Sequence, residues 1–253
     1  MMSLQSSLLE PYQDRLLHGF TVKPNAVSDR SLARETVLEN RRVLCQQAGL
    51  AHERLIVPDQ VHGNRVAVDS EADFTQADGV VLVTPQVPAM VITADCVPVL
   101  LYDPRRHVGA VVHAGWRGTS LAIVSQAILV LRQRANSHPA DLIAVLGPAI
   151  TGAYYPVGKE VLEALKSTVA DTRAFEAACV CPPAPIFANG PMAEQHFVDV
   201  RQVNRLQLEA LGVVSIEVMT DCTYQQVDQF WSHRRGETGR QGAYLQLLAP
   251  CNG

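Results

Sequence analysis

Residues 77–119 read ADGVVLVTPQVPAMVITADCVPVLLYDPRRHVGAVVHAGWRGT, and this stretch decides the fold class. Four short runs rich in Val, Ile and Leu follow one another here, separated by turns that contain Pro or Asp. Such runs, bounded by turn residues, are typical of β-strands. We therefore predict strands over 79–83, 89–92, 97–102 and 108–112, with residues 103–106 as the turn between the last two.

The regions on both sides of this stretch add helices as well as strands. Apolar residues at helical spacing predict helices over 31–48, 121–134, 157–167 and 200–211. Shorter β-rich runs predict strands over 54–57, 65–68, 142–146, 213–218 and 243–248. Residues 180–192 crowd Pro, Gly and Asn together, which predicts a loop within the domain. Strand pairs beside long helices predict an α+β chain of one domain, residues 1–253, with mixed sheets covered by helices.

The composition excludes several classes of protein. Hydrophobic residues make up 47% and charged residues 18% of the 253 residues, which is typical of a globular chain with a large core. The formal net charge of −4 argues against general binding to nucleic acid or to an anionic membrane. The sequence contains no apolar run of about 18 residues, so we predict no membrane span. The amino terminus lacks a signal-peptide pattern. We expect a cytoplasmic enzyme whose cysteines are mostly reduced thiols.

Three turns between β-rich runs each carry a residue that binds soft metals. The turns are DQVHG at 59–63, TADCVP at 93–98 and VHAGWRG at 112–118. His62, Cys96 and His113 would supply three ligands for zinc and leave the fourth position for a water whose pKa falls to about 7. The alternative is that both histidines are hydrogen-bonded structural residues and that Cys96 is a small buried hydrophobe.

Two segments offer arginines to an anionic group. Arg117 lies directly before a predicted helix, and the glycines near it let an anion come close to the backbone. An arginine beside the start of a helix is typical of a phosphate site. The same features fit a capped helix with a surface arginine. Residues 232–240 (SHRRGETGR) place Arg234, Arg235 and Arg240 in a loop that is either a phosphate or carboxylate clamp or a solvated basic turn.

Taken together, seven segments resemble the YfiH family, also called the laccase-domain or multicopper polyphenol oxidoreductase family. In family order they are residues 59–66, 77–104, 108–119, 146–150, 154–161, 198–213 and 221–241. Residues 1–53 are a divergent amino-terminal part. Residues 18–28 read HGFTVKPNAVS where relatives carry a pattern like HGFTTRxGGVS, so the arginine and the paired glycines are missing. If this stretch helps to form the mouth of the pocket, substrate preference differs from that of the family.

The resemblance implies a fold, a metal site and an activity. The implied fold is an α/β sandwich with mixed β-sheets inside and helices outside, and the implied zinc ligands are His62, Cys96 and His113. The implied activities are phosphorolysis of adenosine, inosine and methylthioadenosine, and deamination of adenosine by zinc-bound water. Arg117 is the first candidate for holding the phosphate, followed by the arginines at 234, 235 and 240.

Three other functions stay open. A copper-dependent polyphenol oxidase (laccase) needs more ligands than this chain offers, because only eight histidines are present and five lie outside the best-matched loops. A muropeptide-precursor amidase acting in peptidoglycan editing would use the same metal site, and the sequence does not separate the two kinds of pocket. A non-enzymatic binding protein would keep the three residues for structure alone. The leading hypothesis takes purine nucleosides and phosphate as partners, without nucleic acid or membrane, and leaves the oligomeric state undetermined.

Overall fold

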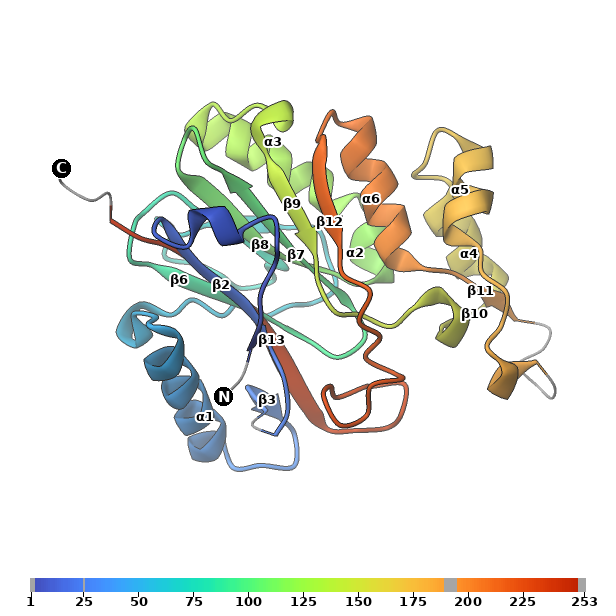
Figure 1. Cartoon of the computed structure of the whole chain (residues 1–253), viewed down its shortest axis with the longest axis horizontal. Coiled ribbons are helices and arrows are strands. Elements are labelled where there is room, and N and C mark those ends of the chain that lie inside the picture. Colours follow the sequence, from blue (N-terminus) through green and yellow to red (C-terminus); the bar gives the residue numbers. More distant parts are fainter. Residues whose placement is uncertain (1–2, 25, 189–194, 250–253) are drawn as a thin grey trace.

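Two β-sheets packed face to face form the centre of the computed structural model, which describes residues 3–24, 26–188 and 195–249 (Figure 1). The larger sheet is mixed and has the order β12 (Ser215–Val218), β9 (Ile143–Leu146), β7 (Val97–Asp103), β8 (Val108–Ala114), β5 (Gly79–Leu82), β4 (Val66–Val68). In the second sheet, β13 (Gly239–Leu247) pairs antiparallel with β2 (Leu16–Thr21), β6 (Pro88–Thr93) and β3 (Ser28–Asp29). The short strand β1 (Ser3–Leu4) pairs with β2, and β10 (Pro156–Val157) pairs with β11 (His196–Phe197).

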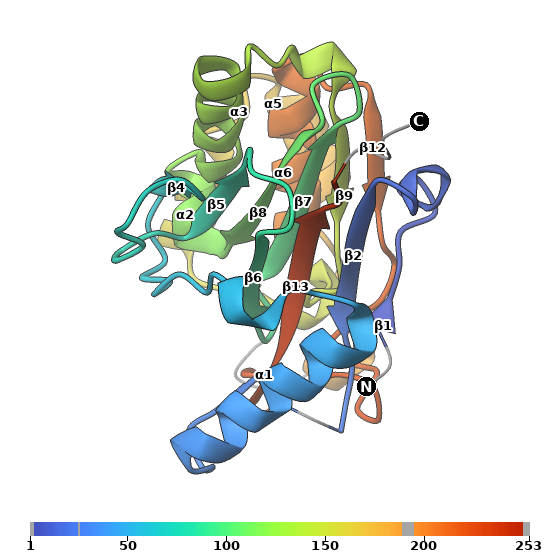
Figure 2. The same ribbon diagram turned by 90° about the vertical axis from the view of Figure 1, so that its left-hand side faces the viewer.

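Helices cover the outer faces of both sheets (Figure 2). The larger sheet is covered by α2 (Trp116–Ser120), α3 (Ile123–Ala135) and α6 (Val200–Ala210), with α4 (Lys159–Lys166) and α5 (Thr172–Cys179) packed beyond them. On the other side, α1 (Arg34–Ala48) packs its buried residues against β6 and β13. Five 3-10 turns complete the described elements: Glu10–Tyr12, His52–Arg54, Pro139–Asp141, Gly152–Tyr154 and Pro185–Phe187. This arrangement confirms the predicted α/β sandwich with mixed sheets inside and helices outside.

Strand alternation decides which side chains point into the layer between the sheets. On β8, Val112 and its even-numbered neighbours pack under the helices, whereas Val111 faces the second sheet. His113 shares the face of Val111, because successive side chains alternate along a strand. The same rule puts Asp78, directly before β5, on the face of Val80, and Cys96, directly before β7, on the face of Leu100. Three chemically active side chains therefore meet at one end of the inter-sheet layer.

The structure confirms one predicted helix and corrects one predicted strand. The helix predicted over 121–134 is present as α3, and the separate short helix α2 before it was not predicted. Ala122, between the two helices, has a left-handed conformation (φ 54°). The strand predicted over 54–57 is reduced to one bridge between Ile56 and Ala89.

The sequence also did not predict the strand β2 and the helix α5. The loop predicted over 180–192 contains the Pro185–Phe187 turn, and its residues 189–192 lie outside the described part. Among the described residues, none of the helices combines the length and the apolar character that a bilayer crossing requires.

Candidate metal centre between two cavities

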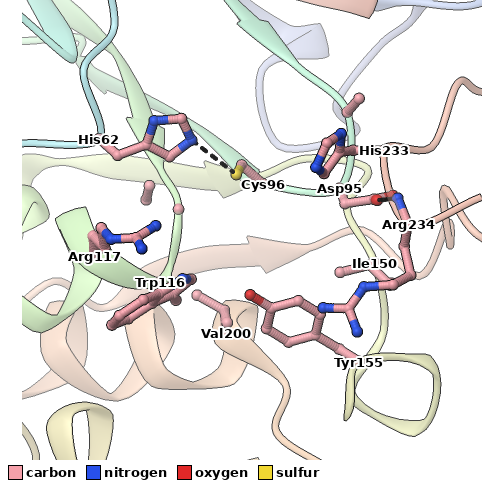
Figure 3. A pocket seen from close by; sticks show the side chains of 13 residues that line it. His62, Asp95, Cys96, Trp116, Arg117, Ile150, Tyr155, Val200, His233 and Arg234 are labelled. Carbon is pink, nitrogen blue, oxygen red and sulfur yellow. Dashed lines mark hydrogen bonds between the residues drawn. The ribbon is translucent and has the colours of Figure 1, made fainter. Parts of the chain in front are cut away.

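The three predicted ligands come together at the ends of the central strands, and Figure 3 shows two of them, His62 and Cys96. One donor atom each from His62, Cys96 and His113 lies within 4.8 Å of the other two, and Cys96 Sγ is 4.0 Å from His62 Nε2. The two imidazole rings meet edge to face, with 4.8 Å between their centroids. His113 is almost fully buried, Cys96 is partly buried, and His62 is exposed. The cluster therefore opens to solvent on the side of His62.

A buried carboxylate holds both histidines in place. Asp78 Oδ1 accepts a hydrogen bond from His113 Nδ1 at 2.8 Å, and the Asp78 carboxylate accepts three more from the backbone N–H groups of residues 61–63. Asp78 and His113 lie directly opposite each other in the β5–β8 register, where the His113 N–H donates to the Asp78 carbonyl. Because Nδ1 of His113 is engaged by Asp78, Nε2 is the nitrogen left to bind a metal.

Left-handed backbone and a glycine shape the turns that carry the ligands. His62 has φ 62° and Asp95, directly before Cys96, has φ 85°, conformations that non-glycine residues adopt at a cost of about 1–3 kcal/mol. A Cβ atom on Gly115 would lie 3.0 Å from Cys96 Sγ and 3.2 Å from the His62 ring. Asp95 itself points away from the cluster and accepts hydrogen bonds from Thr223 Oγ1, Ser232 Oγ and the Arg234 N–H. Its role is to tie the 221–235 loop to the Cys96 turn.

Charge pairing in the cluster favours the thiolate form of Cys96 and the protonated form of His113, so a metal would bind His113 Nε2 in place of a proton. Burial alone would raise the pKa of the Cys96 thiol, but the neighbouring histidines outweigh it and lower the pKa to about 6. Burial opposes the charged form of His113, yet Cys96 and Asp78 raise its pKa to about 9. Burial also opposes ionisation of Asp78, yet hydrogen bonds, chiefly from His113, hold its pKa below the usual value. Cys96 is therefore predominantly a thiolate near neutral pH, which is the form that coordinates metal ions.

The donor set fits a soft or borderline transition metal. Two imidazole nitrogens and one thiolate form a ligand set typical of catalytic zinc, and they also suit copper. Ligand atoms around tetrahedral zinc lie roughly 3.5 Å apart, given bonds of about 2.0–2.3 Å. The observed separations, up to 4.8 Å, are wider, so the ligand atoms would move closer together on binding zinc. In the described part of the chain, no second group of three or more His, Cys, Asp or Glu side chains of this kind is found.

Two cavities meet at this cluster. The first, of about 260 Å³, is walled by Trp116, Tyr155, Ile150 and Val200 and is entered past Arg117 and Arg234 (Figure 3). The second, of about 340 Å³, is lined by all three residues of the triad. Both cavities are lined by His62, Ala94, Cys96 and His233, so the two cavities adjoin at these residues.

The four predicted arginines occupy three different surroundings. Arg117 lies over the Trp116 ring, 4.4 Å from its centroid, and lines the first cavity. Arg234 lines the same cavity, lies 4.9 Å from the centroid of Tyr155, and donates to a backbone carbonyl. Arg235 lines neither cavity, because its guanidinium donates to three backbone carbonyls and to a glutamate carboxylate. Arg240 lines the second cavity.

Comparison with known proteins identifies the family of this chain. The family model described as "Multi-copper polyphenol oxidoreductase laccase" matches residues 24–248. The chain belongs to this family. It is 28% identical to "Purine nucleoside phosphorylase YlmD" from Bacillus subtilis (strain 168), across 92% of this chain and 88% of that protein. It is 30% identical to "Adenosine deaminase RL5" from an unknown prokaryotic organism, across 79% of this chain and 76% of that protein.

A solved structure of a family member has the same fold. The crystal structure of the Bacillus licheniformis hypothetical protein YfiH superposes with a TM-score of 0.80 at 27% identity, covering 92% of each chain. Relatives named for nucleoside processing and the described fold therefore coincide in one family. The resemblance inferred from the sequence motifs is confirmed.

Sequence reasoning missed several residues that line or support the site in this laccase-family chain. Asp78 was overlooked because its contact with His113 depends on strand register, although its position directly before a β-rich run was a usable signal. Trp116 and Tyr155 wall the first cavity, and His233 lines both cavities. From the divergent segment at 18–28, Ser28 lines the second cavity. Ser28 is a position at which this segment keeps the family pattern.

Proposed function

We propose that this chain is a zinc-dependent purine nucleoside enzyme that catalyses phosphorolysis of adenosine, inosine and methylthioadenosine, and deamination of adenosine. The observation that carries the proposal is the His62–Cys96–His113 cluster in the wall of an aromatic cavity. The names of the relatives, purine nucleoside phosphorylase and adenosine deaminase, support the substrate class. The cavity offers ring faces, guanidinium groups and a metal site within one space, as a nucleoside requires.

His62, Cys96 and His113 would hold the metal, and Asp78 would orient both histidines. When bound there, zinc would supply Lewis acidity and activate water as a nucleophile near neutral pH. The protein contributes the orientation, because the Asp78 carboxylate fixes the His113 tautomer and the backbone of the His62 turn. Gly115 leaves room for both Cys96 and His62, since a side chain there would contact both.

The first cavity would receive the purine. Trp116 and Tyr155 present aromatic surface on which a base can stack, while Ile150 and Val200 exclude water from it. Arg117 and Arg234 offer N–H donors at the rim to oxygen or nitrogen atoms of the nucleoside. Burial raises the pKa of Tyr155 to about 12, so its hydroxyl stays protonated and can donate a hydrogen bond to the substrate.

A copper-dependent phenol oxidase is the less favoured function. Blue-copper electron transfer uses a His₂Cys site, but a multicopper oxidase needs further copper ligands. The described residues contain a single cluster of the required kind, which suits one ion.

Turnover of a muropeptide precursor in place of nucleosides would show that the same metal site serves the amidase function.

Metal content and nucleoside turnover, measured on the same preparations, test the proposal. We expect about one zinc per chain in the purified protein, loss of that zinc in His62→Ala, Cys96→Ser and His113→Ala, and parallel loss of adenosine and inosine turnover. Cys181→Ser is the matched control, because this partly buried thiol lies outside the cluster. Zinc retained in all three variants would contradict the ligand assignment. Zinc-loaded protein without nucleoside turnover, in the presence of phosphate, would contradict the proposed activity.

A further inference from the structure

The second cavity differs from the first in the chemistry of its walls. Its lining contains no Trp, Tyr or Phe, in contrast to the first cavity. Instead it carries two guanidinium groups, from Arg30 and Arg240, and two hydroxyl groups, from Ser28 and Thr238. Guanidinium and hydroxyl donors without a ring face suit an oxyanion better than a flat base.

Strand pairing between distant parts of the chain builds this cavity. In the antiparallel pair β3–β13, Ser28 lies directly opposite Arg240, and side chains opposite each other in such a pair share one face of the sheet. Arg30 follows β3 immediately, and Thr238 precedes β13 immediately. The four side chains therefore lie on or directly beside the short β3–β13 strand pair.

The two arginines lie close enough to repel each other. Burial lowers the pKa of Arg240, and the positive charge of Arg30 lowers it further. Within the described residues neither side chain forms an ion pair. Arg240 donates hydrogen bonds to the carbonyl oxygens of Glu237 and Gly239. These bonds occupy N–H donors of its guanidinium group but do not neutralise its positive charge. Two cations facing one cavity without a bound carboxylate are stabilised by an anionic ligand.

Nearby carboxylates reduce this positive charge without cancelling it. Asp29 is occupied by the backbone N–H and the hydroxyl of Ser31, and Asp95 is occupied by the 221–235 loop. Asp59 is exposed and lines the second cavity, where it would repel an anion. The cavity lining holds two guanidinium groups, from Arg30 and Arg240, against one carboxylate, from Asp59, while the Cys96 thiolate in the same lining is paired with His113.

We propose that the second cavity binds the phosphate co-substrate of phosphorolysis through Arg30 and Arg240, while the purine occupies the adjoining aromatic cavity. This inference rests on the proposed function. Phosphorolysis is a displacement in which a phosphate oxygen forms a bond to the sugar C1′ as the C1′–N9 bond breaks. The electron pair of that bond leaves with the purine, which takes up a proton, and the products are ribose 1-phosphate and the free base. The two cavities adjoin at His62 and Cys96, so a sugar at this junction would lie between the base in the first cavity and the phosphate in the second.

The assignment replaces Arg117 as the first candidate for the phosphate. Arg117 and Arg234 lie over aromatic rings and line the cavity that suits the base. Arg235 is fully engaged with the loop around it. Among the four arginines predicted from the sequence, Arg240 is thus the one that lines a cavity without aromatic rings in its wall.

Phosphate binding is measured on zinc-loaded protein in two ways. The first is the rise in melting temperature that phosphate causes, at an ionic strength kept constant with chloride. The second is the KM for phosphate with inosine as the nucleoside substrate. Arg30→Gln should weaken phosphate binding about tenfold, because it removes one charge-assisted contact, and Arg240→Gln should do the same. Asp59→Asn should strengthen binding by about threefold, because it removes a repelling charge. Arg173→Gln is the matched control, since Arg173 is exposed on α5 and lines neither cavity.

The outcomes separate this inference from the proposed function. Adenosine deamination uses no phosphate, so it should continue in Arg30→Gln while phosphorolysis slows at low phosphate. Phosphate stabilisation that depends on Arg30, in a protein without nucleoside turnover, would support the anion site and contradict the proposed function. Phosphorolysis whose KM for phosphate rises in Arg117→Gln but not in Arg30→Gln would support the function and overturn this inference. A wild-type protein that phosphate does not stabilise and does not saturate would also overturn it.

Discussion

His113 on the larger sheet and His18 on the smaller sheet are both almost fully buried, with 2% and 4% of their surface exposed. Both lie on strand faces directed between the sheets. Burial lowers the pKa of His18 to about 4, and its Nε2 accepts a hydrogen bond from the Ser6 N–H, which requires the neutral ring. Cys96 and Asp78 instead raise the pKa of His113 to about 9. The comparison shows that burial alone keeps a histidine neutral, and that charged partners distinguish the histidine at the candidate metal centre.

The largest effect is expected when His113 itself is removed. His113→Ala should abolish metal binding and lower the unfolding free energy of the metal-free protein by about 3–5 kcal/mol, because it leaves the buried Asp78 carboxylate without its imidazole partner. His62→Ala should also abolish metal binding but change stability by less than about 1 kcal/mol, since His62 is exposed. Urea denaturation of chelator-treated proteins measures the difference, and equal losses in both variants would contradict it.

Asp78→Asn tests whether the carboxylate partner makes the difference between the two buried histidines. We expect metal affinity to fall about 10–100-fold, because the amide no longer orients both histidines as the carboxylate does. Stability should fall by about 2–3 kcal/mol as charge-assisted hydrogen bonds are lost. Asp69→Asn is the control, since Asp69 is a part-buried carboxylate that accepts from Val83 and Thr84 and does not contact the ligands. Unchanged zinc affinity in Asp78→Asn, from competition with a chromogenic chelator, would refute the orienting role.

The pH dependence of stability tests the uncharged state of His18. Its pKa in the folded chain, about 4, lies below the ordinary value of 6.5, so the unfolded chain binds more protons between these values. Stability from this group is present above pH 6.5 and is lost as the pH falls towards 4. We expect a loss of about 1.5 kcal/mol between pH 6.5 and pH 5. His18→Gln should reduce the slope measured by denaturation across this window, and an unchanged slope would contradict the prediction.

Gly115→Ala should give the smallest change in stability, under about 1 kcal/mol, because the added Cβ meets side chains that can shift slightly. Those side chains are Cys96 and His62, so we expect zinc affinity to fall by about tenfold even though the chain folds normally. Gly63→Ala is the matched control, since a Cβ there makes contacts of 3.6 Å only. Equal zinc affinities in the two variants would show that the ligands tolerate the displacement.

Much of the fold followed from local pattern, and the exceptions have physical reasons. Four strands between residues 79 and 114 were predicted closely, because each is an apolar run between turns. The short helix α2 and the break that separates it from α3 were not predicted, because Leu121 and Ala122 are good helix formers. At the break, the Asn64 side chain donates to the Leu121 carbonyl, and Gly118 packs against the backbone of Gly63. The helix therefore ends for a tertiary reason.

The sequence by itself determined the alternation of apolar residues, the three turns with metal-binding side chains, and the family to which the chain belongs. These features are local or linear, so no knowledge of partners in space is needed to find them. Only the tertiary structure decided that Asp78 supports both histidines, that Arg235 is engaged while Arg30 and Arg240 face one cavity, and that His18 stays neutral while His113 is charged. Strand register and the packing of two sheets bring together residues far apart in the chain, and the charge of a buried group depends on those neighbours.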